Sequence, residues 1–291
     1  MLAPRREPMS APATPQARPE FSLAHLTVLG LPPPQLVYVA ARAGYDYVSP
    51  RLIYLGLPGE PNYALAEQPE LLTRTKTALA STGMRVHDIE LARIVEGVDV
   101  RRFLPAIEVG AELGARALLC SIWGGARGEQ IDKFGALCDL VRPYGMTLDL
   151  EYVPIAAVTN LAQAVDILRA VDRPNAGLMI DMHHFHRARD RVEDLDGLPR
   201  EWFHFAHLCD APGEIPADRD AVIHILREAR LYVGEGGIPV AEILEHIPSR
   251  VYSIELPHKA RAQEFGEAEH AFRCLETLKD YLARHETAAA A

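Results

Sequence analysis

The chain has 291 residues, of which 48% are hydrophobic and 24% are charged, and its formal net charge at pH 7 is −10. This composition excludes an intrinsically disordered chain, which has fewer apolar residues for its charge. The acidic surplus argues against an extended nucleic-acid-binding surface, because such a surface neutralises phosphates with Lys and Arg. The four cysteines lie far apart and form no C-x-x-C pair, which argues against a zinc ribbon or a disulfide scaffold.

The two ends of the chain differ in composition from its middle. Residues 1–20 contain many Pro, Ala and Arg but no apolar segment of a secretory signal, so we expect a flexible leader. Residues 286–291 end in a run of Ala and are expected to be a disordered tail. No apolar run approaches the roughly 20 residues that a membrane span requires. We therefore expect one catalytic domain over residues 21–285, in a cytoplasmic protein with reduced, buried cysteines.

Short apolar runs recur along the chain, each bounded by Gly, Pro or polar residues. Their length and composition are typical of buried parallel strands. In chain order, the eight runs cover residues 21–30, 45–53, 84–94, 115–124, 146–154, 176–184, 203–211 and 251–257.

Amphipathic segments separate these runs, and several end at a Gly that can form a left-handed C-cap. The predicted helices cover residues 34–44, 69–83, 101–114, 128–145, 160–172, 220–230, 239–247 and 268–285. Eight strands that alternate with helices over about 260 residues predict a single-domain α/β fold, the (β/α)8 TIM barrel. The alternative is a doubly wound sheet, but GLPPPQL after the first run lacks the glycines of a phosphate-binding loop.

Functional residues of such a barrel lie at the carboxyl ends of its strands. The fifth, sixth and eighth runs end near Glu151, Asp181 and Glu255, and the seventh contains His207. Because side chains alternate along a strand, one register points all four toward the barrel axis. Three converging carboxylates repel one another unless a cation lies among them. The set predicts one divalent metal ion, with Mn²⁺ favoured and Mg²⁺, Co²⁺ or Zn²⁺ as alternatives.

Each of these residues also has an ordinary structural interpretation. An acid after a strand is often a helix N-cap, and a single His on a strand is often a packing residue. Arg51, Glu90 and Trp123 also fall near strand ends and extend the candidate site. A Trp at this position can stack on a substrate, and an Arg can bind a carboxylate through two hydrogen bonds. The alternatives are packing of the barrel mouth for Trp123 and a surface ion pair for Arg51.

The order and spacing of these residues resemble the xylose isomerase-like superfamily of metal-dependent barrels, often described as sugar phosphate isomerases and epimerases. The resemblance covers nearly the whole chain after residue 20. It implies four metal ligands: Glu151, Asp181, His207 and Glu255. The D-x-x-H motif of the family appears at residues 181–184, and by resemblance His184 contacts a substrate oxygen. The H-x-x-D motif of the family appears at residues 207–210.

Two departures leave the branch within this superfamily open. Sugar epimerases often carry an Arg shortly after the seventh-strand His, whereas residues 211–214 here are Ala-Pro-Gly-Glu. The segments LCDAP and REARLYVGEGGIPV instead resemble the bacterial 3-dehydroshikimate dehydratase branch. In that branch an Arg before the GEG turn reaches the substrate, which points to Arg230 or Arg227. A Lys that some of those dehydratases carry is replaced by Cys209, so neither branch is matched in full.

We therefore expect a metal-dependent isomerase or epimerase of a small polyhydroxylated ketone or aldehyde. Glu151 and Glu255 are the expected acid–base pair, which removes a proton next to the carbonyl to give an enediolate. His184 is expected to stabilise the developing oxyanion. The expected substrate contacts are His184, Arg51, Trp123, Arg230 and Glu90.

Other functions remain as alternatives. A lyase on the same site would eliminate a β-leaving group from 3-dehydroshikimate or a 3-keto-glycoside. The net charge disfavours an apurinic endonuclease, and the complete ligand set disfavours a non-catalytic binding protein. The expected partner is a small-molecule substrate, with neither nucleic acid nor membrane, and a homo-oligomer is left open.

Overall fold

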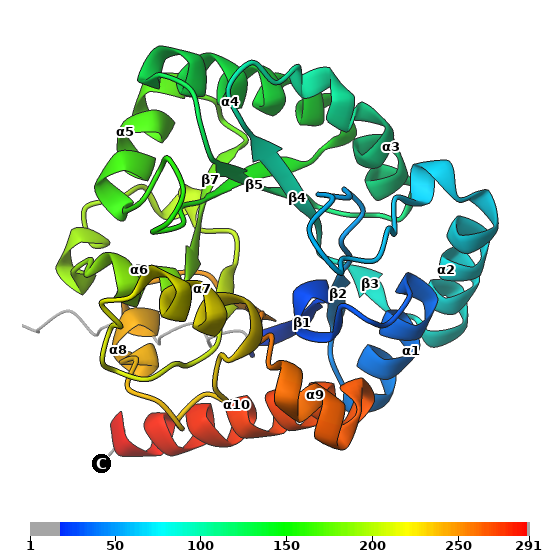
Figure 1. Cartoon of the computed structure of the whole chain (residues 1–291), viewed down its shortest axis with the longest axis vertical. Coiled ribbons are helices and arrows are strands. Elements are labelled where there is room, and N and C mark those ends of the chain that lie inside the picture. The colour runs from blue at the N-terminus through cyan, green and yellow to red at the C-terminus, as the bar shows by residue number, and fades with distance from the viewer. Residues whose placement is uncertain (1–17, 290–291) are drawn as a thin grey trace, which may run out of the picture.

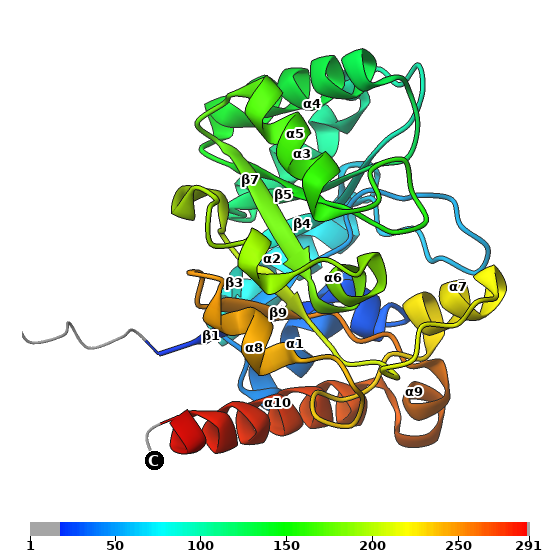
Figure 2. The same ribbon diagram turned by 90° about the vertical axis from the view of Figure 1, so that its left-hand side faces the viewer.

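The computed structural model of the chain describes residues 18–289, so most of the predicted leader lies outside the described residues. Nine parallel strands form one nearly closed barrel in the order β3-β2-β1-β9-β8-β7-β6-β5-β4, with helices around it (Figures 1 and 2). The strands are β1 (Glu20–Ala24), β2 (Tyr47–Ser49), β3 (Arg85–Val86), β4 (Asp88–Ile94), β5 (Ala117–Ile122), β6 (Thr147–Glu151), β7 (Ala176–Asp181), β8 (Ala206–Leu208) and β9 (Val251–Ile254). The predicted TIM barrel is confirmed.

The seam of the barrel lies between β2 and β4. The predicted strand at residues 84–94 is two strands, because His87 interrupts it. β3 pairs with β2, and the backbone of Glu90 in β4 forms hydrogen bonds with the segment that follows β2. Its N–H donates to Pro50 O at 3.0 Å, and its carbonyl oxygen accepts from Leu52 N at 3.0 Å. These bonds place the end of β2 beside β4 and bring their side chains to the same mouth of the barrel.

Every predicted helix is present. The helices are α1 (Pro33–Ala43), α2 (Pro69–Thr82), α3 (Leu104–Glu112), α4 (Arg127–Val141), α5 (Leu161–Val171), α6 (Met182–Ala188), α7 (Arg219–Glu228), α8 (Val240–Glu245), α9 (Lys259–Phe265) and α10 (Glu267–Ala289). Gly44 and Gly83 end α1 and α2 at φ +90° and +69°, a region that favours Gly.

Two helices were not predicted, and one corrects a strand boundary. The run at 176–184 was expected to be all strand, but it turns into α6 after Asp181. The carboxylate of Asp181 accepts a hydrogen bond from His184 N and thereby caps the new helix. The second unpredicted helix is α9, which precedes α10. α10 continues to Ala289 and so runs into the segment that the sequence analysis assigns to the tail.

Apolar side chains pack both outside and inside the barrel. Most of the core lies between the strands and the surrounding helices. A smaller apolar cluster is separate from this core. Its residues lie in or next to strands of the sheet and are Leu91, Ala117, Leu119, Met179 and Phe205. Met179 belongs to this cluster and lies two residues before Asp181, so strand alternation places both side chains on one face. The apolar cluster therefore supports the polar mouth of the barrel.

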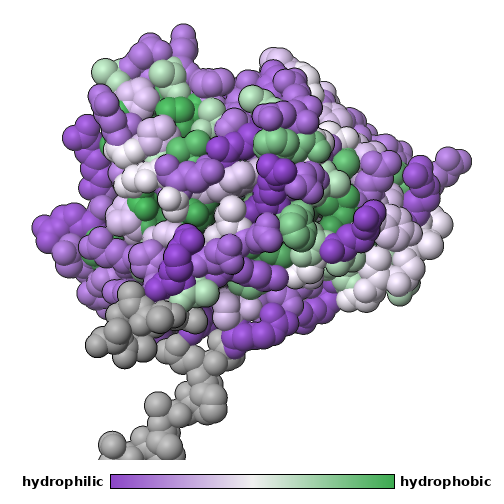
Figure 3. All heavy atoms as spheres, turned by 90° about the horizontal axis from the view of Figure 1, so that it is seen from below, coloured by the Kyte–Doolittle hydropathy of each residue, from purple (hydrophilic) through white to green (hydrophobic). Residues whose placement is uncertain are grey.

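The outer surface is mostly polar. The face that carries α10 is largely hydrophilic, with apolar side chains in small separate patches (Figure 3). Among the described residues, no helix is long and apolar enough to cross a membrane.

The carboxylate of Asp210, two residues after β8, organises the return segment that leads toward α8. Its Oδ1 accepts hydrogen bonds from Ala211 N at 2.8 Å and Ile238 N at 3.0 Å. Its Oδ2 accepts from Gly234 N at 3.0 Å and Gly236 N at 2.9 Å. A Cβ on Gly236 would meet the carbonyl of Ala211 and the carboxylate itself, so the turn requires Gly there. Asp210, the last residue of the H-x-x-D motif, therefore has a structural role as a hydrogen-bond acceptor.

Replacement of Asp210 by Asn should destabilise the fold. The amide nitrogen of Asn cannot accept a hydrogen bond, and backbone donors would lose their partner. We expect the free energy of unfolding to fall by about 3 kcal/mol, as measured by denaturant titration. The control is Asp196→Asn, because the exposed carboxylate of Asp196 has His246 as its partner among the described residues, and it should change stability by less than about 0.5 kcal/mol. Equal stability of the Asp210 variant and wild type would contradict this role.

Candidate metal centre

Four buried side chains converge at the carboxyl ends of neighbouring strands. Glu151 and Asp181 are the last residues of β6 and β7, His207 lies in β8, and Glu255 follows β9 directly. Each offers one ligand atom, and these atoms all lie within 4.8 Å of one another. The structure thus brings together the four residues that the strand-end pattern selects. Their role as ligands stays a prediction.

The imidazole ring of His207 lies among the three carboxylates and forms no hydrogen bond within residues 18–289. Its Nδ1 is 3.7 Å from Glu151 Oε1, 3.8 Å from Asp181 Oδ2 and 3.6 Å from Glu255 Oε2. Both ring nitrogens of His207 and Oε1 of Glu151 are buried without a hydrogen-bond partner among the described residues. Buried polar atoms without partners are rare because they lose their hydration. A divalent cation among them would satisfy several at once, so the donor set fits a metal with oxygen and nitrogen ligands.

The charges of the group are balanced by neighbours. Burial raises the pKa of Glu255 and of Asp181, but the nearby Arg230 and His207 together outweigh burial and hold both pKa values below their usual range. Burial lowers the pKa of His207, yet Glu255 and Glu151 outweigh it and raise the pKa well above its usual value. Without a metal, a proton on His207 therefore provides part of the missing positive charge. A metal ion held by His207 would have to displace that proton.

Arg230 is a buried cation beside the four residues. Its guanidinium is 2.6 Å from Asp181 Oδ2 and 2.9 Å from Glu255 Oε2. One nitrogen also donates to the backbone oxygen of Glu255 at 3.1 Å. The backbone of Leu231, next to Arg230, forms two hydrogen bonds with Asp210, so Asp210 also fixes the position of this Arg. The sequence predicts Arg230 as a substrate contact, and the structure shows its guanidinium bound to two carboxylates.

His184 lies in the first turn of α6 and faces the group. Its Nε2 is 3.6 Å from Glu151 Oε1. Its backbone N–H donates to Asp181 Oδ1 at 2.9 Å, so the helix cap also orients this carboxylate. His183, Asp181 and His184 form a second group with metal-ligating atoms close together, and this group shares Asp181 with the first.

A cavity of about 740 Å³ opens above these residues. Six of the predicted site residues line it: Arg51, Trp123, Glu151, His184, Arg230 and Glu255. Arg93, which the sequence analysis did not predict, also lines it. Residues 55–60, between β2 and α2, border one side, and residues from α7 and α9 border the other.

Glu90 is fully buried and is not among the residues that line the cavity. Its Oε2 is 3.3 Å from a guanidinium nitrogen of Arg51. Burial raises the pKa of Glu90 to about 8, despite the nearby Arg51. The structure therefore places Glu90 where it supports Arg51, while direct contact with a substrate stays an untested prediction.

Trp123 follows β5 at the cavity wall. Its indole N–H donates to Ser121 Oγ at 2.8 Å, which fixes the ring. The guanidinium carbon of Arg93 lies 4.2 Å from the ring centroid, a distance typical of a cation–π contact. The sequence analysis passed over Arg93, because it lies inside a strand that also carries the apolar Leu91 and Ile94. The available signal was the position of Arg93, one residue before the end of β4 at Ile94.

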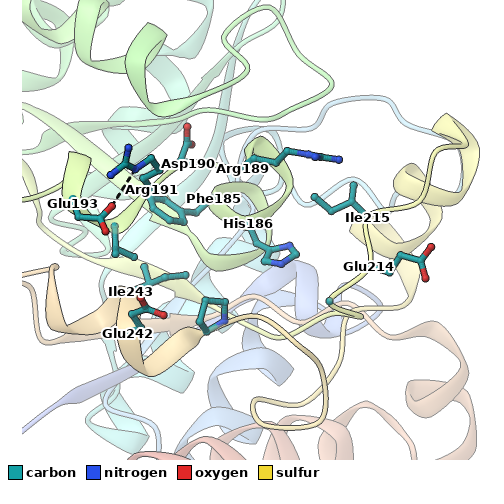
Figure 4. A pocket seen from close by; sticks show the side chains of 13 residues that line it. Phe185, His186, Arg189, Asp190, Arg191, Glu193, Glu214, Ile215, Glu242 and Ile243 are labelled. Atoms are coloured by element: carbon teal, nitrogen blue, oxygen red, sulfur yellow. Dashed lines mark hydrogen bonds and ion pairs between the residues drawn. The ribbon is translucent and has the colours of Figure 1, made fainter.

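A second hollow of about 680 Å³ lies outside the barrel, beside α6 and α8 (Figure 4). It is lined by side chains of both charges, and Arg191 lies 3.2 Å from Glu193 across its edge. None of the predicted site residues lines it. Its mixed charge and lack of a converging ligand set distinguish it from the strand-end site.

Comparison with known proteins identifies related sequences. The family model described as a xylose isomerase-like TIM barrel matches residues 37–278. The inosose isomerase of Bacillus subtilis is 31% identical over 135 residues, covering 43% of this chain and 45% of that protein. The inosose isomerase of Bacillus licheniformis is 31% identical over 137 residues, covering 45% of this chain and 47% of that protein. The chain thus matches less than half the length of these curated relatives.

Solved structures share the fold at lower identity. The IolI protein with a bound zinc atom superposes with a TM-score of 0.75 at 21% identity, covering 91% of this chain and 98% of that chain. D-allulose 3-epimerase from Methylomonas sp. with D-allulose gives 0.65 at 19% identity, covering 90% and 97%. The probable 3-DHS dehydratase from Bacillus anthracis gives 0.64 at 17% identity, covering 86% and 97%. Such identities establish the common fold alone.

The ligand set predicts metal binding that depends on His207. Protein loaded with Mn²⁺ or Zn²⁺ and then desalted should retain about one ion per chain by elemental analysis. The ion should raise the free energy of unfolding by about 2.7 kcal/mol at a hundredfold excess over Kd. Because His207 has a raised pKa, proton competition should weaken metal binding as the pH falls from neutral.

The variant His207→Asn should lose the ion and the stabilisation. His246→Asn removes a His that binds the exposed Asp196 and should retain both. Wild-type protein that neither retains a divalent ion nor gains stability from one would contradict the metal centre.

Proposed function

The chain belongs to the xylose isomerase-like TIM barrel family, and on this basis we propose that it is a metal-dependent isomerase or epimerase of a small polyhydroxylated ketone or aldehyde. The observation that carries the proposal is the convergence of three carboxylates and one imidazole beneath a cavity of about 740 Å³. The inosose isomerases of two Bacillus species, at 31% identity over part of the chain, support the same class of reaction. A cytoplasmic location and a homo-oligomeric state stay predictions.

Glu151, Asp181, His207 and Glu255 would hold the ion. When bound, the ion supplies Lewis acidity that polarises the carbonyl and hydroxyl oxygens of the substrate. The native metal is proposed to be Mn²⁺, with Zn²⁺, Mg²⁺ and Co²⁺ as alternatives that the same oxygen and nitrogen donors accept.

Glu151 is suited to take a proton from carbon. Its Oε1 has no hydrogen-bond partner among the described residues, and Glu151 lines the cavity. In the proposed step, the proton on the carbon next to the carbonyl moves to the carboxylate of Glu151, the C–H electron pair forms the double bond of an enediolate, and the carbonyl electron pair moves onto its oxygen. Return of the proton to the former carbonyl carbon, with transfer of the neighbouring hydroxyl proton to the former carbonyl oxygen, completes an isomerisation.

Glu255 stands opposite Glu151, because β7 and β8 separate β6 from β9 in the sheet. Its Oε2 is held by Arg230 at 2.9 Å, so its orientation is restricted more than that of Glu151. A base on each side of the substrate allows epimerisation, in which a proton leaves one face and returns on the other. His184 Nε2 faces the same space and would donate a hydrogen bond to the oxygen that becomes negative.

A lyase on the same site is the second candidate. The first proton abstraction is shared, and loss of hydroxide from the β carbon would then give dehydration. The segment that carries Arg230 resembles dehydratases, which favours this reading. Cys209 stands where some of those dehydratases carry a Lys, and burial raises its pKa to about 12. Cys209 is therefore a neutral thiol at physiological pH and does not replace an ammonium group, which favours the isomerase.

Proton exchange in D₂O tests the proposal. Mn²⁺-loaded protein is incubated with ketoses, inososes and 3-dehydroshikimate, and deuterium in each recovered compound is measured by mass spectrometry. We expect deuterium next to the carbonyl of the true substrate. An isomeric product supports the isomerase, and an unsaturated product supports the lyase. Absence of exchange with all of these compounds would contradict the proposal.

Replacing Glu151 or Glu255 by Gln should abolish turnover while the fold remains. The loss should be at least about 100-fold, the lower range for a missing general acid–base group. Glu112→Gln is a matched control, because in the described part of the chain that exposed carboxylate forms its ion pair with Lys76. Steady-state kinetics and circular dichroism measure the two effects. Full activity in both Gln variants would refute the assignment.

A further inference from the structure

Three arginines gather on the cavity above the strand-end site. Arg51 follows β2, Arg93 lies in β4, and Arg227 lies in α7, and all three line the cavity. We refer to Arg51, Arg93 and Arg227 as the arginine wall. The side chain of Arg51 is only 7% exposed, and its Nε has no hydrogen-bond partner among the described residues.

The arginine wall has few carboxylates to balance it. Arg51 lies 3.8 Å from Glu60 Oε1 and 3.3 Å from Glu90 Oε2. Burial raises the pKa of Glu90 to about 8, which reduces the negative charge that it sets against Arg51 near neutral pH. Within residues 18–289, Arg93 and Arg227 form no ion pair, and the Nε of Arg93 is buried without a hydrogen-bond partner. Within the described residues, Glu60 and Glu90 are therefore the carboxylates that form ion pairs with the arginine wall, which carries three guanidinium groups.

The three charges are close enough to oppose one another. Burial lowers the pKa of Arg93, and the charges of Arg51 and Arg227 lower it further. Glu60 and Glu151 act in the opposite direction. A concentration of like charge in a partly buried cavity attracts an ion of the opposite sign, as the carboxylates below attract a cation.

Three other acids that line the cavity already have partners, and Glu151 belongs to the strand-end site. Glu228 lies 3.6 Å from Lys259 Nζ, and Glu267 accepts a hydrogen bond from Gly30 N at 2.9 Å. Glu255 is bound by Arg230. The positive charge of the arginine wall is therefore left for a group that enters the cavity from outside.

Trp123 makes Arg93 a good anion ligand. The ring lies against one face of the guanidinium, with 4.2 Å between the guanidinium carbon and the ring centroid. Stacking restricts the side chain and leaves the N–H groups at its edge free to donate. A planar guanidinium held in this way can bind a phosphate or a carboxylate through two parallel hydrogen bonds.

We propose that the arginine wall binds an anionic group of the substrate, a phosphate or a carboxylate, while the carbonyl of that substrate lies at the strand-end site. Arg93 is the principal contact with the anion, and the buried Arg51 is the second contact. Arg227, in α7, contributes the third positive charge. This inference rests on the proposed function and makes its substrate class narrower: an acidic polyhydroxylated carbonyl compound instead of a neutral one.

Equilibrium binding tests the arginine wall without turnover. Titration calorimetry on metal-loaded protein compares three probes: inorganic phosphate, gluconate and the neutral polyol myo-inositol. We expect wild type to bind phosphate or gluconate, and Arg93→Gln to weaken that binding at least tenfold. Binding of the neutral polyol should be the same in both proteins. The anion with the larger loss identifies phosphate or carboxylate as the natural group.

Matched variants separate the arginine wall from folding and from the metal. Arg93→Lys keeps the charge without the fork of donors and should retain part of the anion affinity. Arg127→Gln removes an exposed Arg that pairs with Asp166 and should bind anions as wild type does. Metal content and the unfolding midpoint of each variant must match wild type. If Arg93→Gln fails to fold, the comparison of Arg93→Lys with wild type decides, and equal affinities there overturn the proposal.

The outcomes distinguish this inference from the proposed function. Equal anion affinity in Arg93→Gln and wild type, or no anion binding by wild type, overturns the arginine wall. Proton exchange on a neutral ketose would then still support the isomerase. Anion binding that depends on Arg93, together with no proton exchange on any carbonyl compound, upholds the arginine wall and refutes the proposed function.

Discussion

Repulsion among three buried carboxylates dominates the mouth of the barrel. Glu151, Asp181 and Glu255 lose their hydration there, and none of them can move away, because each is attached at the end of a strand. Arg230 offsets part of this repulsion by binding Asp181 and Glu255, and His207 lies among the three carboxylates. The remaining deficit of positive charge, and the unpartnered atoms of His207 and Glu151, make a divalent cation the natural complement.

The rest of the architecture serves to hold these charges in place. Asp181 is at once a candidate ligand, the cap of α6 and a partner of Arg230, so one carboxylate links the strand, the helix and the site. The carboxylate of Asp210 accepts four hydrogen bonds from backbone N–H groups, and its backbone pairs with Leu231, the residue after Arg230. A change in either acid would therefore act on the site through geometry as well as through charge.

Opposite charges are separated within the same cavity. Glu151 and Glu255 line this cavity together with the arginine wall, so under the two proposals a substrate would meet a cation-dependent carbonyl site and an anion site. This separation suits a small molecule with a carbonyl at one end and an acidic group at the other. It also explains why a net charge of −10 is compatible with a locally positive cavity wall.

The sequence by itself determined the barrel and the four converging residues, because both follow from local periodicity. Alternation along a strand decides which face a side chain takes, and parallel strands bring their carboxyl ends to one mouth. The helix α6 was missed because an apolar pattern does not show where an Asp stops a strand by capping a helix. Only the tertiary structure decided the partners of distant residues: Arg230 on Asp181 and Glu255, Glu90 beneath Arg51, and Arg93 on Trp123. These contacts join residues far apart in the chain, so the spacing of residues along a strand cannot predict them.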